Sequence, residues 1–158
     1  MLGFLTKIFG SKSERDIKAL QPLVAQINEE YAKLSSLSND ELRHKTVEFK
    51  ATITNALADI DAKVADIIWK AENQELSLQE TTAMYDEVDA LGKERDVELE
   101  KVLLQIMPAA FATVKETSRR LSENNELEVT ATQFDRDYAA RKSNVKIVGD
   151  KALWANKW

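Results

Sequence analysis

A glutamate and the only histidine of the chain stand three residues apart, at Glu41 and His44. The pattern Glu-x-x-His is half of the ligand set of di-iron carboxylate bundles, and Glu29 and Glu30 lie in the preceding helical stretch. A complete set needs a second Glu-x-x-His, for which the chain has no second histidine. Glu41 also follows Ser38 at the spacing of a helix capping box. We therefore expect no metal site and no catalytic residue here.

The composition and motifs exclude further kinds of chemistry. The chain has no cysteine, which excludes disulfides, thiolate metal ligands and cysteine nucleophiles. No segment matches the G-x-x-x-x-G-K-[ST] loop that binds nucleotide phosphates. The net charge of −5 argues against nucleic-acid binding. The sequence thus predicts no cofactor bound by this chain and no nucleic-acid partner.

A long helix predicted from Leu37 to Ala71 organises the chain. Ser38 and Glu41 begin it, and no glycine or proline interrupts it. Its apolar side chains recur at intervals of mostly three and four residues, which places them on one stripe that must pack against partners. These positions are Leu42, Phe49, Ile53, Ala56, Leu57, Ile60, Val64, Ile67 and Ile68.

A second long helix is expected after a turn at residues 72–75. Ser77 and Glu80 form another capping box, and the apolar pattern continues to Ile106. Pro108 is expected to begin a separate helix that ends around residues 122–125. Because only a short turn joins the two long helices, they should form an antiparallel hairpin.

The helix expected between Ser13 and Ser35 carries a packing seam. Its apolar residues step by three and four, the spacing with which helices pair, and we interpret this seam as core. Pro22 lies inside the run and predicts a kink or a split near Gln21. The seam consists of Ile17, Leu20, Val24, Ile27, Tyr31 and Leu34.

After Asn125 the pattern typical of long helices ends, and the C-terminal residues predict short strands and a short helix. Residues 127–129 suit a short strand, and Thr130 with Gln133 resembles a capping box for a helix through about Arg141. Two runs, 144–148 and 151–154, flank Gly149-Asp150 and predict a β-hairpin. The fold class is therefore mainly α, a long antiparallel helical hairpin packed with shorter helices, plus a small C-terminal β-hairpin.

The first ten residues predict a short amphipathic helix. Its apolar side chains would cover an arc of about 160°, with cations beside and behind them. Such a helix suits a membrane interface, and it equally suits docking on its own protein. The residues are Leu2, Phe4, Leu5, Ile8 and Phe9, with the cations Lys7 and Lys12.

Charge is unevenly distributed along the chain, and its distribution differs between the domains that we predict. Residues 59–100 hold 13 acidic and 4 basic side chains, whereas both flanking regions are mildly basic. We expect an amphipathic helix at 1–12, a helical domain at 13–125 with an acidic hairpin at about 59–98, and a small α/β extension at 126–158. An acidic run of this kind is usually just a solvated surface, and we favour that interpretation here. The end at Trp154–Trp158, without a polar tail, suggests a cut through a larger protein.

Three segments in order resemble SecA, the ATPase motor family of bacterial preprotein translocation. Residues 4–11 read FLTKIFGS, residues 34–46 read LSSLSNDELRHKT, and residues 107–120 read MPAAFATVKETSRR. The second is similar to the family's L-S-D-E-E-L-K-x-K-T, and the third to its I-P-E-A-F-A-V-V-R-E-A-S-K-R. The resemblance covers residues 1–57 and 99–121, and departs at 59–98 and 122–158, which look inserted.

The resemblance implies a role in translocation without chemistry in this chain. The family's adenine-side motif and Walker A loop do not occur before Trp158, so ATP and Mg²⁺ would bind beyond it. The residues Leu2, Phe4, Leu5, Lys7, Ile8, Phe9 and Lys12 align with the part that contacts anionic phospholipid and the SecYEG channel. The family further implies preproteins as partners and a location in the cytoplasm and on the cytoplasmic face of the inner membrane.

Two alternatives stay open. The chain is either the N-terminal segment of such a motor or a free-standing, non-catalytic helical adaptor. A homodimer is a further expectation, since the apolar seams can pair within a chain or between chains.

Overall fold

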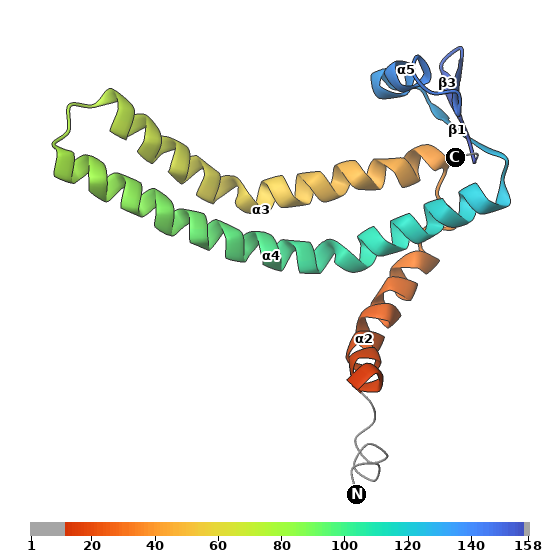
Figure 1. Ribbon diagram of the computed structural model, residues 1–158, viewed down its shortest axis with the longest axis horizontal. Coiled ribbons are helices and arrows are strands. Elements are labelled where there is room, and N and C mark those ends of the chain that lie inside the picture. Colours follow the sequence, from red (N-terminus) through yellow and green to blue (C-terminus); the bar gives the residue numbers. More distant parts are fainter. Residues whose placement is uncertain (1–11, 157–158) are drawn as a thin grey trace, which may run out of the picture. The chain divides into compact units, whose positions relative to one another are not determined.

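The computed structural model describes residues 12–156, which form long helices followed by a small sheet (Figure 1). This arrangement confirms the predicted fold class, mainly α with a long helical hairpin and a C-terminal β-hairpin. The elements are α2 (Lys12–Ala32), α3 (Asn39–Asn73), α4 (Leu78–Glu123), β1 (Glu126–Thr130), α5 (Gln133–Ala139), β2 (Val145–Val148) and β3 (Lys151–Ala155).

The described residues divide into two units. The hairpin unit is Thr46–Met107, the distal part of α3 and the proximal part of α4. The terminal unit combines the described residues up to Lys45 with those from Pro108 onward. The division predicted from the sequence, at residues 12/13 and 125/126, stays a prediction.

Capping boxes begin both long helices, as the sequence predicts. The Glu41 carboxylate accepts hydrogen bonds from the Ser38 amide (2.7 Å) and hydroxyl (2.8 Å), and the Ser38 hydroxyl accepts from the Glu41 amide at 3.2 Å. Ser77 and Glu80 make the same set at the start of α4. These bonds satisfy amide groups of the first turns that have no partner within the helix.

The hairpin unit is a pair of antiparallel helical segments that lie side by side (Figure 1). Its buried side chains are Leu57 and Ile60 from α3 and Val102 from α4. Toward the connection at residues 74–77, the apolar side chains are only partly buried or exposed. An ion pair also joins the two helices, since Arg95 Nε on α4 donates to Asp61 Oδ1 on α3 at 2.6 Å.

The predicted helix break at Met107–Pro108 is wrong, because α4 continues through Pro108 to Glu123. A proline inside a helix removes one hydrogen bond and crowds the preceding turn, at a cost of about 3 kcal/mol. Here strong helix formers flank it, Met107 before and Ala109 and Ala110 after, and they favour continuation. Of the kink or split predicted near Gln21, the split is wrong, since α2 is one helix from Lys12 to Ala32, and the kink stays a prediction.

The terminal unit has a helical core and a sheet core. Leu34, Leu42 and Ala112 form the first, with Ile27 and Tyr31 packed against it. The predicted α2 seam is therefore core only at its C-terminal end. Ile17, Leu20 and Val24 are 50–57% exposed, so the prediction that they are core is wrong for the described residues.

The sheet has three antiparallel strands in the order β1-β3-β2. Gly149 has φ +63°, the left-handed conformation that the β2–β3 turn needs and that glycine adopts readily. The N-cap of α5 is Thr132, paired with Asp135, so the predicted Thr130–Gln133 box is wrong by two residues. Thr130 instead ends β1, where its amide bonds to α3.

Candidate functional site

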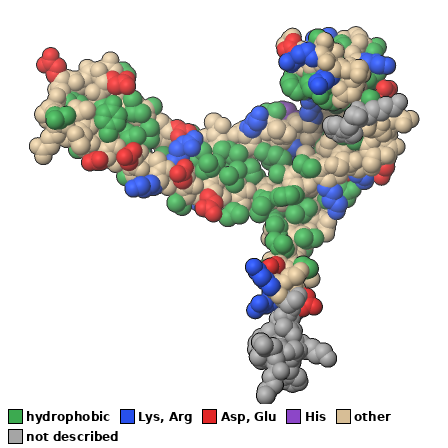
Figure 2. Space-filling model, in the orientation of Figure 1, with side chains coloured by type: hydrophobic (Ala, Val, Ile, Leu, Met, Phe, Trp, Pro, Cys, Tyr) green, Lys and Arg blue, Asp and Glu red, His purple; other side chains and the backbone are tan. Residues whose placement is uncertain are grey.

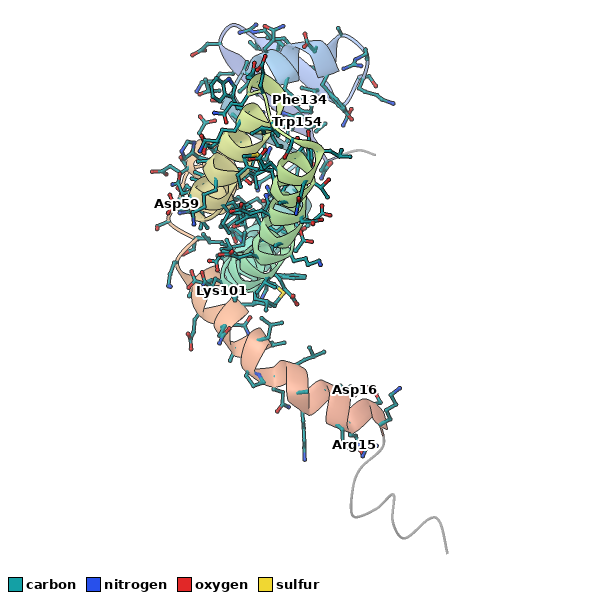
Figure 3. All side chains as sticks on the ribbon, turned by 90° about the vertical axis from the view of Figure 1, so that its left-hand side faces the viewer. Arg15, Asp16, Asp59, Lys101, Phe134 and Trp154 are labelled. Carbon is teal, nitrogen blue, oxygen red and sulfur yellow. The ribbon has the colours of Figure 1, made fainter. Side chains whose placement is uncertain are left out.

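The residues predicted to contact membrane and channel lie almost wholly outside the described part of the chain. Leu2, Phe4, Leu5, Lys7, Ile8 and Phe9 precede residue 12. Lys12 is the first residue of α2, and its side chain is exposed. Figure 3 shows Arg15 and Asp16 in the following turn. The predicted contact set therefore stays a prediction.

The Glu-x-x-His pattern has a structural role in the terminal unit. Glu41 is held in the capping box, where the hydrogen bonds from Ser38 lower the pKa of its carboxyl. His44 is exposed on α3. Among residues 12–156 there is no group of three or more histidine, aspartate or glutamate side chains placed to hold a metal ion.

The first turn of α3 binds the backbone of β1. Asn39 Nδ2 donates to the Glu128 carbonyl at 3.0 Å. The Asp40 carboxylate accepts from the Thr130 amide at 2.8 Å and from its hydroxyl at 2.7 Å. Although partial burial favours the neutral carboxyl, these two bonds lower the pKa of Asp40. The turn therefore caps its own helix and fixes a strand close to 90 residues away.

A buried carboxylate, Asp135, is the centre of the same junction. Arg43 donates to both its oxygens, with Nη1 at 2.9 Å and Nη2 at 3.0 Å, and Trp154 Nε1 donates to Oδ1 at 3.0 Å. Thr132 adds its amide and its hydroxyl. Burial alone would raise the pKa of Asp135, but the bonds from Arg43 and Thr132 outweigh it and lower the pKa to about 2. Asp135 is therefore ionised at neutral pH.

A second buried carboxylate, Glu116, organises the connection between α2 and α3. Hydrogen bonds from Arg119, the largest cause, and from Arg120 lower the pKa of the Glu116 carboxyl to about 2. Burial of the carboxyl opposes this shift, because it would raise the pKa. Arg120 also donates to the Leu34 and Leu37 carbonyls at 3.1 and 2.7 Å. The guanidinium thus gives the Leu37 carbonyl a donor and adds a second donor to the Leu34 carbonyl, which also accepts from the Leu37 amide at 3.1 Å.

Sequence reasoning missed both carboxylate networks. Glu116 and Arg120 are four residues apart, the spacing at which helix side chains form ion pairs, so this one pair of the Glu116 network could have been predicted from the sequence. For Arg43 and Asp135 no local signal exists, because 92 residues separate them. In the described part of the chain, every buried side-chain nitrogen and oxygen has a hydrogen-bond partner, so these networks are complete and structural.

Three aromatic rings stack beside Asp135. The three ring centroids form a triangle, and that of Tyr138 is 5.2 Å from Trp154 and 5.8 Å from Phe134. The rings of Phe134 and Trp154 are 6.4 Å apart and nearly parallel (Figure 3). Phe134 is 60% exposed, and Trp154 is fixed by its bond to Asp135. The aromatic cluster is therefore joined to the buried carboxylate through Trp154.

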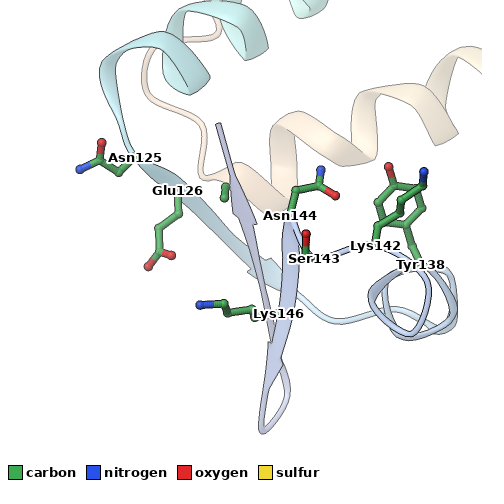
Figure 4. A pocket seen from close by; sticks show the side chains of 8 residues that line it. Asn125, Glu126, Tyr138, Lys142, Ser143, Asn144 and Lys146 are labelled. Carbon is green, nitrogen blue, oxygen red and sulfur yellow. The ribbon is translucent and has the colours of Figure 1, made fainter. Parts of the chain in front are cut away.

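An open hollow of about 870 Å³ lies beside β2 and the end of β3 (Figure 4). Among its described lining residues the charged groups are Glu126, Lys142 and Lys146. Among the described residues, no hydrogen bond or ion pair joins these three charged side chains to one another, so nothing in the hollow assigns it a role. The remaining lining residues are Asn125, Tyr138, Ser143, Asn144 and Ala155.

Comparisons with known proteins agree on one family. The model of the SecA DEAD-like domain matches residues 5–134. A protein translocase subunit SecA of Cytophaga hutchinsonii is 48% identical over the whole chain, and one of Amoebophilus asiaticus is 43% identical over the whole chain. One of Parabacteroides distasonis is 45% identical over 98% of the chain. The chain spans 14% of the length of each of these relatives. No solved structure matches it.

Proposed function

The chain belongs to the SecA family, and from this membership we propose that it acts in protein translocation as the N-terminal segment of an ATP-driven motor. The observation that carries the proposal is the match to translocase subunits along the whole chain, at 48% identity for the Cytophaga hutchinsonii protein. The matched regions include the long hairpin and the C-terminal sheet, so the resemblance is not confined to a shared helical pattern.

In this proposal the chain contributes docking and support. The motor's nucleotide chemistry, with ATP and Mg²⁺, belongs to the remainder of the motor. The segment from Leu2 to Lys12 docks on anionic phospholipid and on the SecYEG channel, at the cytoplasmic face of the inner membrane. Its apolar residues would enter the interface, and its lysines would attract the lipid headgroups.

The terminal unit suits the supporting role. The Arg43–Asp135 and Glu116–Arg120 networks join segments that are more than 80 residues apart through buried, fully paired charges. Such networks fix one arrangement of their partners, because breaking one leaves a charge without compensation. Among residues 12–156, no helix has the length and apolarity needed to cross a bilayer. Membrane contact in this proposal is peripheral and rests on the segment from Leu2 to Lys12.

The test uses the full-length protein and vesicles rich in phosphatidylglycerol. We expect the double variant Leu5→Glu with Phe9→Glu to lower the fraction bound by about tenfold, because the apolar face no longer enters the interface. Lys7→Glu with Lys12→Glu should weaken binding most at low salt. Val97→Glu serves as the control, since Val97 is already 68% exposed. Equal binding of all variants would refute the docking role.

A separate measurement tests the motor itself. SecYEG- and preprotein-stimulated ATP hydrolysis by the full-length protein should fall in the Leu5→Glu with Phe9→Glu variant, while basal hydrolysis is retained. A full-length protein without preprotein-stimulated hydrolysis would argue against the translocation role and favour the adaptor.

A further inference from the structure

Large apolar side chains lie exposed within two turns of the connection between α3 and α4. Trp69 is 58% exposed, Leu78 85% and Tyr85 45%. Leu78 and Tyr85 are seven residues apart on α4 and therefore share one helix face. Figure 2 shows hydrophobic side chains gathered at this end of the hairpin, with carboxylates around them. We call Trp69, Leu78 and Tyr85 the tip patch.

Exposed carboxylates accompany the tip patch on both helices. Residues 66–89 hold seven acidic side chains and one basic one, a net charge of −6. The seven are all exposed, and the single cation, Lys70, is already paired with Asp66 at 2.5 Å. They are Asp66, Glu72, Glu75, Glu80, Asp86, Glu87 and Asp89. The end of the hairpin therefore combines exposed apolar side chains with a strongly negative set of carboxylates, which we call the acidic rim.

The charge decides which occupant fits the patch. An anionic membrane surface repels a surface of charge −6, and two copies of the tip repel one another. A cationic segment instead gains on approach and can then bury Trp69 and Tyr85, residue types that dominate the energetics of protein interfaces. Exposed apolar patches with a polar rim commonly mark such contacts.

We propose that the tip patch with its acidic rim docks a cationic amphipathic protein segment. The segment carries lysine or arginine beside a row of apolar residues. Its apolar row lies on Trp69, Leu78 and Tyr85, and its cations face the carboxylates of residues 66–89. The site lies within the hairpin unit, apart from the N-terminal residues that the proposed docking on membrane and channel uses.

Another stretch of α4 provides an internal comparison. Between Val102 and Lys115 the chain has exposed apolar side chains but no acidic residue. Leu104 is 57% exposed, Phe111 56% and Val114 65%. If apolar exposure alone drew a partner, this stretch would bind as well as the tip. If charge is also required, only the tip binds.

The experiment uses the full-length protein and a synthetic peptide of about 18 leucine and lysine residues in amphipathic order, with a photoreactive group. After illumination, trypsin releases residues 64–70, which carry Trp69, and residues 71–93, which carry Leu78 and Tyr85, apart from residues 102–115. We expect the adduct on the peptides of residues 64–93 and not on 102–115. A leucine–glutamate peptide of the same pattern, and a serine–lysine peptide of the same charge, should each give at least about tenfold less adduct.

Variants separate the patch from its surroundings. Trp69→Ser with Leu78→Ser should lower the adduct on residues 64–93 by about tenfold. Val97→Ser is the matched control and should change it less than about twofold. Val97 is 68% exposed on the same helix, but residues 93–101 are nearly neutral, with four acidic and three basic side chains. Circular dichroism checks that each variant keeps its helices.

Several outcomes would overturn the proposal. Adduct on residues 102–115 at an equal level would show that apolar exposure suffices. Equal labelling by the leucine–glutamate peptide would show that the rim is irrelevant. Self-association, or binding to anionic vesicles, that the Trp69→Ser with Leu78→Ser variant abolishes would replace the proposed occupant with a second copy or a membrane. None of these measurements involves translocation, so their failure leaves the proposed function untouched.

Discussion

Arg43 and Arg95 make ion pairs of similar length in different surroundings. Arg43 lies 2.9 Å from Asp135, whose side chain is fully buried. Arg95 lies 2.6 Å from Asp61, and both partners are more than a third exposed. Water screens the second pair and would solvate either member left alone, whereas it does not reach Asp135. The two arginines therefore differ in energetic importance although their shortest ion-pair distances are similar.

We expect Arg43→Gln to lower the free energy of unfolding by about 3 kcal/mol, because it leaves a buried carboxylate without its cation. Arg95→Gln should cost less than about 1 kcal/mol. Urea unfolding of both variants, followed by circular dichroism, measures the difference. Equal losses would mean that Trp154 and Thr132 alone compensate the charge of Asp135.

At the scale of the element, two glycines allow the effect of backbone conformation on stability to be measured apart from the effect of side-chain packing. Gly92 lies inside α4, and Gly149 lies in the β2–β3 turn with φ +63°. A Cβ added at either position would meet no heavy atom within 4 Å. Any effect of a methyl group there therefore comes from the backbone conformation alone.

Gly92→Ala should stabilise the chain by about 1 kcal/mol, since alanine is the better helix former. Gly149→Ala should destabilise it by about 1 kcal/mol, since a left-handed conformation strains any residue with a Cβ. Thermal unfolding of the two variants beside the parent chain tests both signs at once. A loss of stability in Gly92→Ala would reveal a close contact at that face of α4.

Local signals predicted the elements, and long-range contacts decided their boundaries and surroundings. Ser38–Glu41 and Ser77–Glu80 are complete within one turn, so the sequence shows them directly. At Pro108 the local rule failed, because one missing hydrogen bond does not outweigh the helix on either side. The Arg43–Asp135 junction was invisible, since nothing near either residue indicates a partner 92 positions away.

At the scale of the whole molecule, the long helices belong to both units. Each of α3 and α4 has one end in the terminal unit and the remainder in the hairpin unit. Charge differs between the parts, and the carboxylates are concentrated in the hairpin unit. What the sequence alone could not supply is the pairing of β1 with β3, which joins strands on either side of α5 and β2.

We expect the isolated chain of 158 residues to hydrolyse no ATP. It has no loop of the G-x-x-x-x-G-K-[ST] type to hold the phosphates, and its buried carboxylates are occupied by arginines. Phosphate release by the purified chain, beside the full-length protein under the same conditions, measures this. Turnover that remains constant through successive purification steps would contradict the expectation.

The separation of Arg43 from Asp135 also has a consequence in time. The first turn of α3 emerges during synthesis well before its partners, because 92 residues lie between them. At about 5–20 residues per second, that interval is roughly 5–20 seconds. During it, Asn39, Asp40 and Arg43 have no strand to bind, whereas the α3–α4 hairpin is already complete in sequence before β1 has emerged. The sheet cannot close until β3 has followed, so the first turn of α3 waits longest for its partners.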